Sequence, residues 1–342
     1  MSWERRYHPL LNEWVTITSH RNSRPWSGDS LVAVADEPRR YEPDCYLCPG
    51  NSRISGLVND DYTSILVFDN DHPSFGVDAP VVLPPAPGFY RNAPANGVCR
   101  VVCYSPLHNA SLSMLPVAGV NDVLSCWATQ TRSLVGRSDI ESVLVFENKG
   151  GVVGVSNPHP HCQIYATGFV FNTLAREAAA MQAYAGTGDG SLFTDIIDTE
   201  ATDGQRIVAE NEAAIAFVPY FARFPYEVYV APRVTRQYLH DLTGDEMLGL
   251  SSVLSEVLVR LDNLWKMSFP YMLVLHQAPC DGGEYSSYHC HIQIHPPLRQ
   301  PGLQKYLASV ETGAGNFLND TSPEEKAAEL QSVSGVHYLH TH

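Results

Sequence analysis

The sequence lacks any apolar run long enough to cross a membrane. Its apolar stretches, such as residues 213–221, reach about ten residues, whereas a membrane-spanning helix needs about 20. The first residues, MSWERRYHPLLNEW, also lack the apolar core of a signal peptide. We therefore expect a cytoplasmic protein that has no membrane partner.

Basic residues are scarce as well. The chain has 22 Lys and Arg against 37 Asp and Glu, for a formal net charge of −15. Nucleic-acid binding needs a basic surface, so this balance argues against a nucleic-acid partner. It does not exclude an anionic small molecule, because a few cations can be concentrated at one site. In the cytoplasm, the eight cysteines are expected to be thiols or metal ligands rather than disulfides.

The composition is that of a globular protein, with 342 residues, 44% hydrophobic and 17% charged, enough for one large domain or two ordinary ones. Apolar residues recur with helical spacing over 120–131 and over 247–265, the second after a possible capping box at Thr243 and Glu246. Short apolar runs that flank these segments predict strands. They are ILVFDND, CRVVCYSP and SVLVFENK around the first helix, and AIAFVPY, YEVYVAP and YMLVLHQ around the second.

The predicted elements follow one order twice: strand, strand, helix, strand and then a strand that bears histidines. Pro106 precedes His159 by 53 residues, and Pro232 precedes His289 by 57. Duplication explains this similarity, and chance likeness of two α+β halves is the alternative. We predict an α+β fold in which two tandem repeats, residues 1–184 and 185–342, share a mostly antiparallel sheet with flanking helices.

Two further segments carry local signals. Residues 185–205 are rich in Gly, Asp and Thr, which predicts an excursion rather than part of the core. The segment SPEEKAAELQ predicts a last helix, with Ser322 as N-cap, Pro323 at the first helical position and Glu325 at the third.

A CxxC pair, Cys45 and Cys48, offers two thiolates to one tetrahedral ion, for which zinc is the usual choice. A redox CxxC would more typically open a helix in a thioredoxin-like βαβ unit, and no such unit is evident. Two more ligands are needed, and the candidates are His108 and one of His159 or His161. Two unconnected core cysteines are the alternative.

A second group of metal-ligating residues lies around the other histidine strand. His289 and His291 follow a strand that bears His276, and Glu177 lies in a helical stretch after the first histidine strand. Three imidazoles and one carboxylate suit iron or zinc. Histidines that are solvated or bonded to the backbone are the alternative.

His161 could carry out a different kind of chemistry, because a neutral imidazole can attack phosphorus and form a covalent phosphoramidate. Gln163, two residues on, would project beside it on the same face of a strand. Its amide donates a hydrogen bond to a phosphoryl oxygen but cannot transfer a proton near neutral pH. The glycines of NKGGVVGVSN would allow backbone amides to approach phosphates closely.

Taken together, these segments resemble the galactose-1-phosphate uridylyltransferase family of the wider histidine triad superfamily. The resemblance covers nearly the whole chain and is most specific where HPHxQ follows ENKG and SNP. It is carried by RRYHPLLNEWVTITSHRNSRPW, DCYLCPGN, VFENKGGVVGVSNPHPHCQIYA, SFPYMLVLHQAP and YHCHIQIHPPL.

The resemblance implies two histidine-triad-like repeats, with His161 as the nucleophile that accepts uridylyl and Gln163 as a donor to its phosphoryl oxygen. It implies a zinc site at Cys45, Cys48, His108 and His159. It also implies a second site for iron or zinc at Glu177, His276, His289 and His291.

The family's substrate contacts can be carried over in the same way. Uracil and ribose would contact Tyr46, Phe68, Asn70 and Asp71. The nucleotide or phosphate would contact Arg21, Arg24, Asn148, Gly154 and Ser156. The sugar phosphate would be reached from the partner subunit of a homodimer by Lys305, Tyr306 and Glu311.

The implied reaction is ping-pong transfer of uridylyl from UDP-glucose to galactose-1-phosphate. Cys162 and Tyr165 depart from the glycine and tryptophan of the best-known members. The segment ETGAGNFLN is closer to a branch that contains nucleoside-diphosphate-sugar phosphorylases acting on adenine nucleotides. A phosphorylase or adenylyltransferase with the same intermediate is therefore one alternative, and a catalytically silent nucleotide-binding protein is another.

Overall fold

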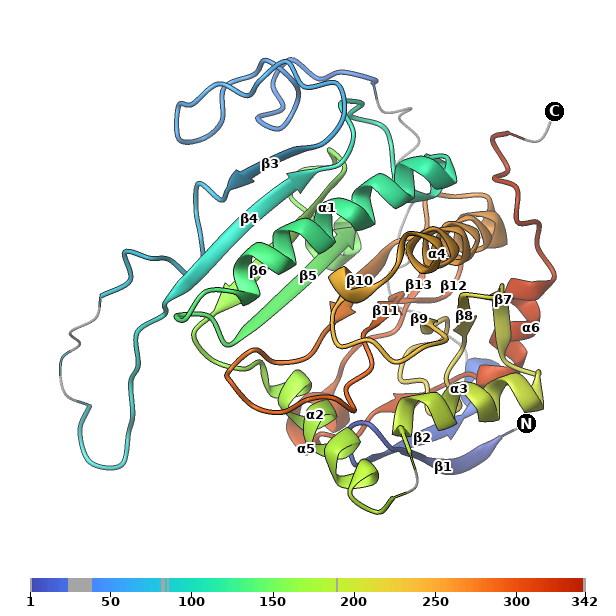
Figure 1. Cartoon of the computed structure of the whole chain (residues 1–342). Helices are drawn as coiled ribbons and strands as arrows, with labels where there is room; N and C mark the ends of the chain where they lie inside the picture. The colour runs from blue at the N-terminus through green and yellow to red at the C-terminus, as the bar shows by residue number, and fades with distance from the viewer. Residues whose placement is uncertain (1, 24–38, 81–83, 85, 189, 341–342) are drawn as a thin grey trace.

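A computed structural model describes residues 2–23, 39–80, 84, 86–188 and 190–340. Its centre is a nine-stranded sheet with the strand order β3-β4-β6-β5-β10-β11-β9-β8-β7 (Figure 1). The strands in chain order are β3 (Leu66–Asp69), β4 (Gly97–Cys103), β5 (Ser142–Lys149), β6 (His161–Thr167), β7 (Ile207–Glu210), β8 (Ala214–Phe217), β9 (Val228–Pro232), β10 (Tyr271–His276) and β11 (His291–His295). Every neighbouring pair in this sheet is antiparallel.

The two halves of the sheet have the same internal order. From its outer edge to the centre the first half reads β3-β4-β6-β5, and the second reads β8-β9-β11-β10, with β7 added outside β8. Helix α1 (Val117–Val135) follows β4 and helix α4 (Gly244–Trp265) follows β9. The halves meet where β5 pairs with β10, with Glu147 opposite Leu273. The predicted α+β fold with two repeats is confirmed, while the boundary between 184 and 185 stays a prediction.

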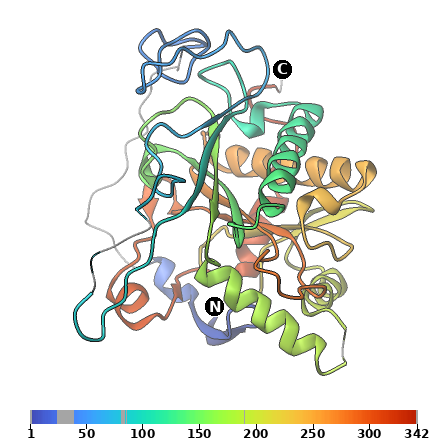
Figure 2. The same cartoon turned by 60° about the vertical axis from the view of Figure 1, so that its left-hand side comes forward.

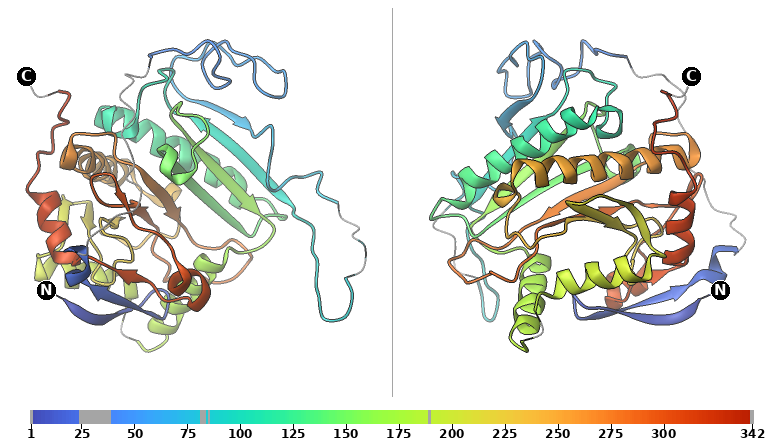
Figure 3. Two further views of the ribbon diagram at one scale, coloured as in Figure 1. Left: turned by 180° about the vertical axis from the view of Figure 1, so that it is seen from behind. Right: turned by 45° about the vertical axis from the view of Figure 1, so that its right-hand side comes forward.

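One face of the whole sheet is covered by the paired helices α1 and α4 (Figure 3). Leu124 and Trp127 of α1 and Leu254 and Leu258 of α4 are buried in one hydrophobic core with Val145 of the sheet. The predicted helical spacings are thus the core faces of these helices. At the start of α4, Thr243 Oγ1 accepts from the Glu246 amide at 3.3 Å, and the Glu246 carboxylate accepts from the Thr243 amide at 2.8 Å. This capping box satisfies two donors at the helix start.

Among the described residues, helices cover the opposite face over its second half. There, α2 (Asn172–Ala185) and α3 (Leu192–Asp203) pack against β8, β9 and β11, beside the hairpin of β1 (Trp3–His8) and β2 (Glu13–Thr18) (Figure 3). Residues 185–205 are therefore not an excursion: Phe193 and Ile197 of α3 are buried in the core. Composition misled the prediction, because most polar residues of α3 lie on the outer side of an amphipathic helix, while Glu200 is buried and pairs with Arg206.

Smaller elements complete the second half. They are β12 (Leu298–Gln300), β13 (Leu303–Gln304), α5 (Ser309–Ala314), β14 (Leu318–Asn319) and α6 (Pro323–Gln331). Strand β14 runs parallel to β2 and so joins the chain's two terminal regions. Over the described residues, no helix is both long and apolar enough to span a bilayer. At the other end of the molecule, the segment from residue 39 to 60 lies beside the ends of β3 and β4 (Figure 2).

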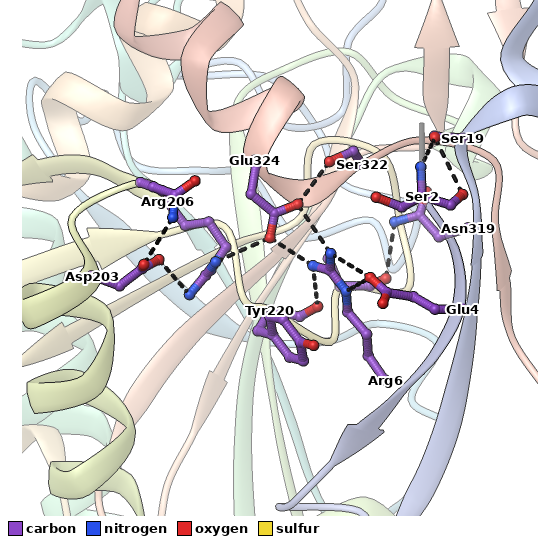
Figure 4. Close-up of polar contacts among 12 residues, drawn as sticks. Ser2, Glu4, Arg6, Ser19, Asp203, Arg206, Tyr220, Asn319, Ser322 and Glu324 are labelled. Atoms are coloured by element: carbon purple, nitrogen blue, oxygen red, sulfur yellow. Dashed lines mark hydrogen bonds and ion pairs between the residues drawn. The ribbon is translucent and has the colours of Figure 1, made fainter.

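The N-terminal hairpin is tied to α6 by an arginine–glutamate–arginine bridge (Figure 4). Glu324 Oε1 accepts from Arg6 at 2.7 Å and from Arg206 at 3.0 Å, and its Oε2 accepts from Ser322 at 2.7 Å. Ser322 is the residue before α6, as predicted, but its hydroxyl makes this bond instead of a cap bond to the helix. The carboxylate thereby links β1, the turn after α3 and α6.

The bridge predicts acid sensitivity. Burial would raise the pKa of Glu324, but bonds from Arg6 and Ser322 outweigh it and lower the pKa to about 2. The carboxylate therefore stabilises the fold above its ordinary pKa of 4.5, and this contribution is lost as the pH falls toward 2. We expect Glu324→Ala to lower the free energy of unfolding at pH 7 by about 2 kcal/mol, and by less near pH 3.

Urea unfolding of wild type and variant across this pH range checks the prediction. Glu325→Ala is the matched control, because no side-chain hydrogen bond or ion pair joins Glu325 to another described residue. Equal losses for both variants at pH 7 would contradict the proposed bridge.

Candidate active site and metal centres

The uncovered face of the first half carries the residues of the predicted active site. Strand β6 alternates, so that Cys162 and Ile164 are buried toward α1 while His161, Gln163 and Tyr165 lie on the open face. The Trp127 indole N–H donates to Cys162 Sγ at 3.0 Å. Cys162 therefore lies beside His161 in sequence but faces the core.

His161 borders a cavity of about 770 Å³. The cavity is also bordered by Asn148 at the end of β5, by Gly150 and Gly151 of the loop that follows, by Asn157, and by Tyr338 near the end of the chain. Gly154 and Ser156 lie exposed on the same loop, and Gly154 has a φ of 84° that favours glycine. The loop joins β5 to β6 and so carries the chain from Asn148 to His161.

The imidazole of His161 is held in one tautomer. Its Nδ1–H donates to the carbonyl of His159 at 2.8 Å, which leaves the lone pair on Nε2. Burial lowers the pKa of His161, although the bond to the His159 carbonyl opposes this effect. The ring is therefore neutral near pH 7 and its free nitrogen is available for attack on an electrophile.

Four side chains from distant parts of the chain meet close to His161. The ligand atoms of Cys45, Cys48, His108 and His159 lie within 4.8 Å of one another, and all four residues are buried. Cys48 Sγ lies 3.6 Å from His108 Nδ1 and 3.5 Å from His159 Nδ1. A tetrahedral zinc ion, with bonds of about 2.3 Å to sulfur and 2.0 Å to nitrogen, would hold these atoms about 3.5 Å apart. The cluster fits a metal ion.

Neighbouring groups orient the ligands. His159 Nε2–H donates to the Ser105 carbonyl at 3.1 Å, so that Nδ1 is free to bind an ion. Asn157 accepts from the His159 amide at 3.0 Å, and its Nδ2 donates to Cys45 Sγ at 3.4 Å. Burial raises the pKa of the Cys48 thiol to about 11. A positive ion at this position would reverse that effect, because it stabilises the thiolate.

A second buried cluster lies under α2. Glu177 Oε2 accepts from His276 Nδ1 and from Tyr288 Oη, both at 2.8 Å, and Oε1 accepts from Gln293 Nε2 at 3.0 Å. His291 completes the group of ligand atoms that lie within 4.8 Å. Burial would raise the pKa of Glu177, but the charge and hydrogen bond of His276 outweigh it and lower the pKa to about 2. The carboxylate is thus available as a ligand.

His289, which the resemblance placed among these ligands, is not brought into the group. Its Nε2 lies 2.8 Å from the Pro232 carbonyl, and its Nδ1 lies 3.4 Å from Thr235 Oγ1. Both ring nitrogens therefore face other partners. The arrangement repeats that of His159, whose Nε2 faces a backbone carbonyl of the preceding strand region.

The predicted uracil and ribose contacts lie at one end of the sheet. Tyr46 and Phe68 border the same hydrophobic cluster as Cys45 and Cys48. The Arg53 guanidinium lies 4.3 Å from the Phe68 ring and 3.8 Å from Asp71 Oδ2. Asn70 Nδ2 donates to Gln163 Oε1 at 3.4 Å. The bond from Asn70 thus connects this group of residues to β6, the strand that bears His161.

The remaining predicted contacts lie elsewhere. Arg21 Nε is 3.6 Å from Asp320, next to β14, and Lys305 Nζ is 3.2 Å from Glu311. Tyr306 is half exposed, and none of these residues borders the cavity at His161. Arg24 lies outside the described residues.

Comparison with known proteins shows to which family the chain belongs. The family model described as "Galactose-1-phosphate uridyl transferase, N-terminal domain" matches residues 1–170, and the model of the C-terminal domain matches residues 177–342. The chain belongs to this family. Membership confirms the predicted resemblance.

Individual proteins of known identity support this family membership. The galactose-1-phosphate uridylyltransferase of Haemophilus influenzae is 35% identical over 335 residues, which cover 98% of this chain and 95% of that protein. A solved uridylyltransferase structure is 30% identical, with a TM-score of 0.78 and coverage of 96% and 97%. An ADP-glucose phosphorylase from Arabidopsis thaliana, at 22% identity, matches with a TM-score of 0.78 over 98% and 99% of the two chains, and this likeness concerns the fold alone.

Some functional neighbours were not predicted from the sequence. Tyr62 lies 2.8 Å from His159 Nε2, Asn157 contacts both Cys45 and His159, and Gln293 donates to Glu177. A signal for Gln293 existed, because it follows His291 at the same spacing as Gln163 follows His161. Tyr62 and Asn157 had no such signal.

The first cluster predicts a metal-dependent fold. We expect Cys48→Ser to remove about one metal ion per chain and to lower the melting temperature, because a bound ion stabilises only the folded ligand set. Elemental analysis and thermal unfolding check this. Cys126→Ser is the control, since Cys126 lies on α1 outside both clusters. Unchanged metal content and melting temperature in Cys48→Ser would disprove the assignment.

Proposed function

We propose that this protein transfers uridylyl from UDP-glucose to galactose-1-phosphate. His161 Nε2 attacks the α-phosphorus, the bond from that phosphorus to the bridging oxygen breaks, and glucose-1-phosphate leaves. A phosphate oxygen of galactose-1-phosphate then attacks the same phosphorus, the P–N bond breaks, and UDP-galactose leaves. The observation that carries this proposal is the bond of His161 Nδ1 to the His159 carbonyl, which leaves Nε2 as the nucleophile.

Gln163 would donate a hydrogen bond to a non-bridging phosphoryl oxygen during both displacements. Asn148 and the loop from Gly150 to Ser156 would hold the phosphates, because they border the same cavity as His161 or lie on its rim. Tyr46, Phe68, Asn70 and Asp71 would hold uracil and ribose. Little other covalent chemistry is required, so rate enhancement would come from positioning and charge stabilisation.

We propose zinc for Cys45, Cys48, His108 and His159, because two thiolates and two imidazoles at these separations suit that ion. It would fix the backbone next to the nucleophile. For Glu177, His276 and His291 we propose iron or zinc, bound for stability. That site lies under α2 in the second half, and its residues do not border the cavity at His161.

We further propose a homodimer in the cytoplasm. Lys305, Tyr306 and Glu311 match family contacts to the sugar phosphate, and in this chain Lys305 and Glu311 pair with each other away from the cavity at His161. A partner subunit would supply them across the interface. The eight free cysteines suit a reducing compartment.

The intermediate predicts covalent labelling. With UDP-glucose labelled in the α-phosphate, we expect one acid-labile, base-stable adduct per chain, located on His161 by peptide mapping. His161→Asn should abolish the adduct, and His240→Asn should keep it. The absence of an adduct on wild type after incubation with several nucleotide sugars would refute the proposal, as would an adduct on another residue.

The acceptor can be tested on the isolated labelled protein. We expect hexose phosphate to discharge the label faster than orthophosphate or water, since Gln163 provides no proton-transfer group to activate water. The segment Glu311–Asn319, read as ETGAGNFLN, favours a phosphorylase as second candidate. Fastest discharge by orthophosphate would establish that alternative, and fastest discharge by water would indicate a hydrolase.

A further inference from the structure

Gln163 can serve the proposed reaction only if its amide N–H group, and not its carbonyl oxygen, faces the phosphoryl group. The two ends of an amide have nearly the same shape, so something must select the end that faces the substrate. An oxygen turned toward a phosphoryl oxygen would repel it. The structure offers one selecting contact, from Asn70.

Asn70 itself is fixed at both its backbone and its side chain. It follows the last residue of β3, and its amide N–H donates to the Cys99 carbonyl at 2.8 Å. Its Oδ1 accepts from the His72 amide at 2.9 Å. Because the oxygen is held in this turn, the Nδ2 end is the one turned toward the sheet.

Nδ2 of Asn70 donates to Gln163 Oε1 at 3.4 Å. This bond occupies the acceptor end of Gln163 and turns its donor end away from Asn70. Among the described residues, no other side-chain hydrogen bond is made by Gln163, so both N–H donors of Nε2 stay available on the open face beside His161.

The second half of the chain supports the same orientation. Gln293 follows His291 as Gln163 follows His161, and its Nε2 donates to the Glu177 carboxylate at 3.0 Å. There the donor end of the amide faces an anionic oxygen from the protein. In the first half, no described carboxylate bonds to Gln163, and an anionic oxygen of the substrate would take that place.

We propose that Asn70 is a positioning residue that selects the catalytic orientation of the Gln163 amide. This role rests on the proposed nucleotidyl transfer and adds to the ribose contact expected from the family. The His72 amide fixes the side chain of Asn70, and Asn70 fixes the amide of Gln163. Gln163 would then donate to the phosphoryl oxygen.

Asn70→Asp tests the orientation directly. The introduced carboxylate keeps an acceptor for the His72 amide but presents an oxygen, instead of an N–H, to Gln163. Gln163 then rotates to donate to this carboxylate and turns its own oxygen toward the phosphoryl group. We expect the single-turnover rate of His161 labelling by UDP-glucose to fall about 100-fold or more, the scale of losing one oxyanion donor.

A double-mutant cycle separates this effect from the added charge and from contacts with ribose. In a Gln163→Ala background no amide can be turned, so Asn70→Asp should cost less than about tenfold further. Asn70→Ala in the wild-type background should also cost less than about tenfold, because Gln163 can still present its donor end. Far-ultraviolet circular dichroism and metal content confirm that each variant folds.

The outcomes are distinct. If Asn70→Asp costs the same factor with and without Gln163, the positioning role is overturned even though labelling of wild type is intact. If wild type itself forms no histidine adduct, the proposed function fails first. Should Asn70→Asp not fold, Asn70→Ser takes its place in the cycle: a coupling of at least about threefold with Gln163 supports the role, and additive effects overturn it.

Discussion

The pairing of β5 with β10 is the interaction on which the arrangement depends. It joins two halves of like strand order into one antiparallel sheet, so that the histidine strands β6 and β11 lie on either side of the central pair. The face shared by His161 and Gln163 continues into the face shared by His291 and Gln293. The two halves differ in the elements that cover this face.

In the second half, α2 lies over the histidine strand and places Glu177 against Gln293 and His276. In the first half, no helix of the described chain takes that position, and a cavity adjoins His161. The same spacing of two histidines and a glutamine thus becomes a buried polar cluster in one half and an accessible reactive site in the other. The elements around the two histidines and the glutamine, and not their spacing alone, decide which chemistry is possible.

Much of this was predictable because the signals were local. The spacing of Leu254 and Leu258 indicated the core face of α4, and CxxC indicated a metal loop. The helix α3 was missed because its polar composition hid an amphipathic pattern that includes Phe193. The contacts of Asn70 and Tyr62 could not be predicted, since they depend on how the turn after β3 and the segment that bears Cys45 and Cys48 approach β6 in space. His289 shows the converse, as a residue of the expected type at the expected spacing whose ring nitrogens face other partners.

The placement of the two clusters along the chain has a consequence for the unfolded protein. Cys45 and His159 are 114 residues apart, and Glu177 and His291 are also 114 residues apart, over intervals that do not overlap. An ion at either cluster would act as a reversible cross-link that closes its own loop of the polypeptide. Closing a loop of this length restricts the denatured chain, so each loop would add an entropic constraint that is separate from the other and from the pairing of β5 with β10.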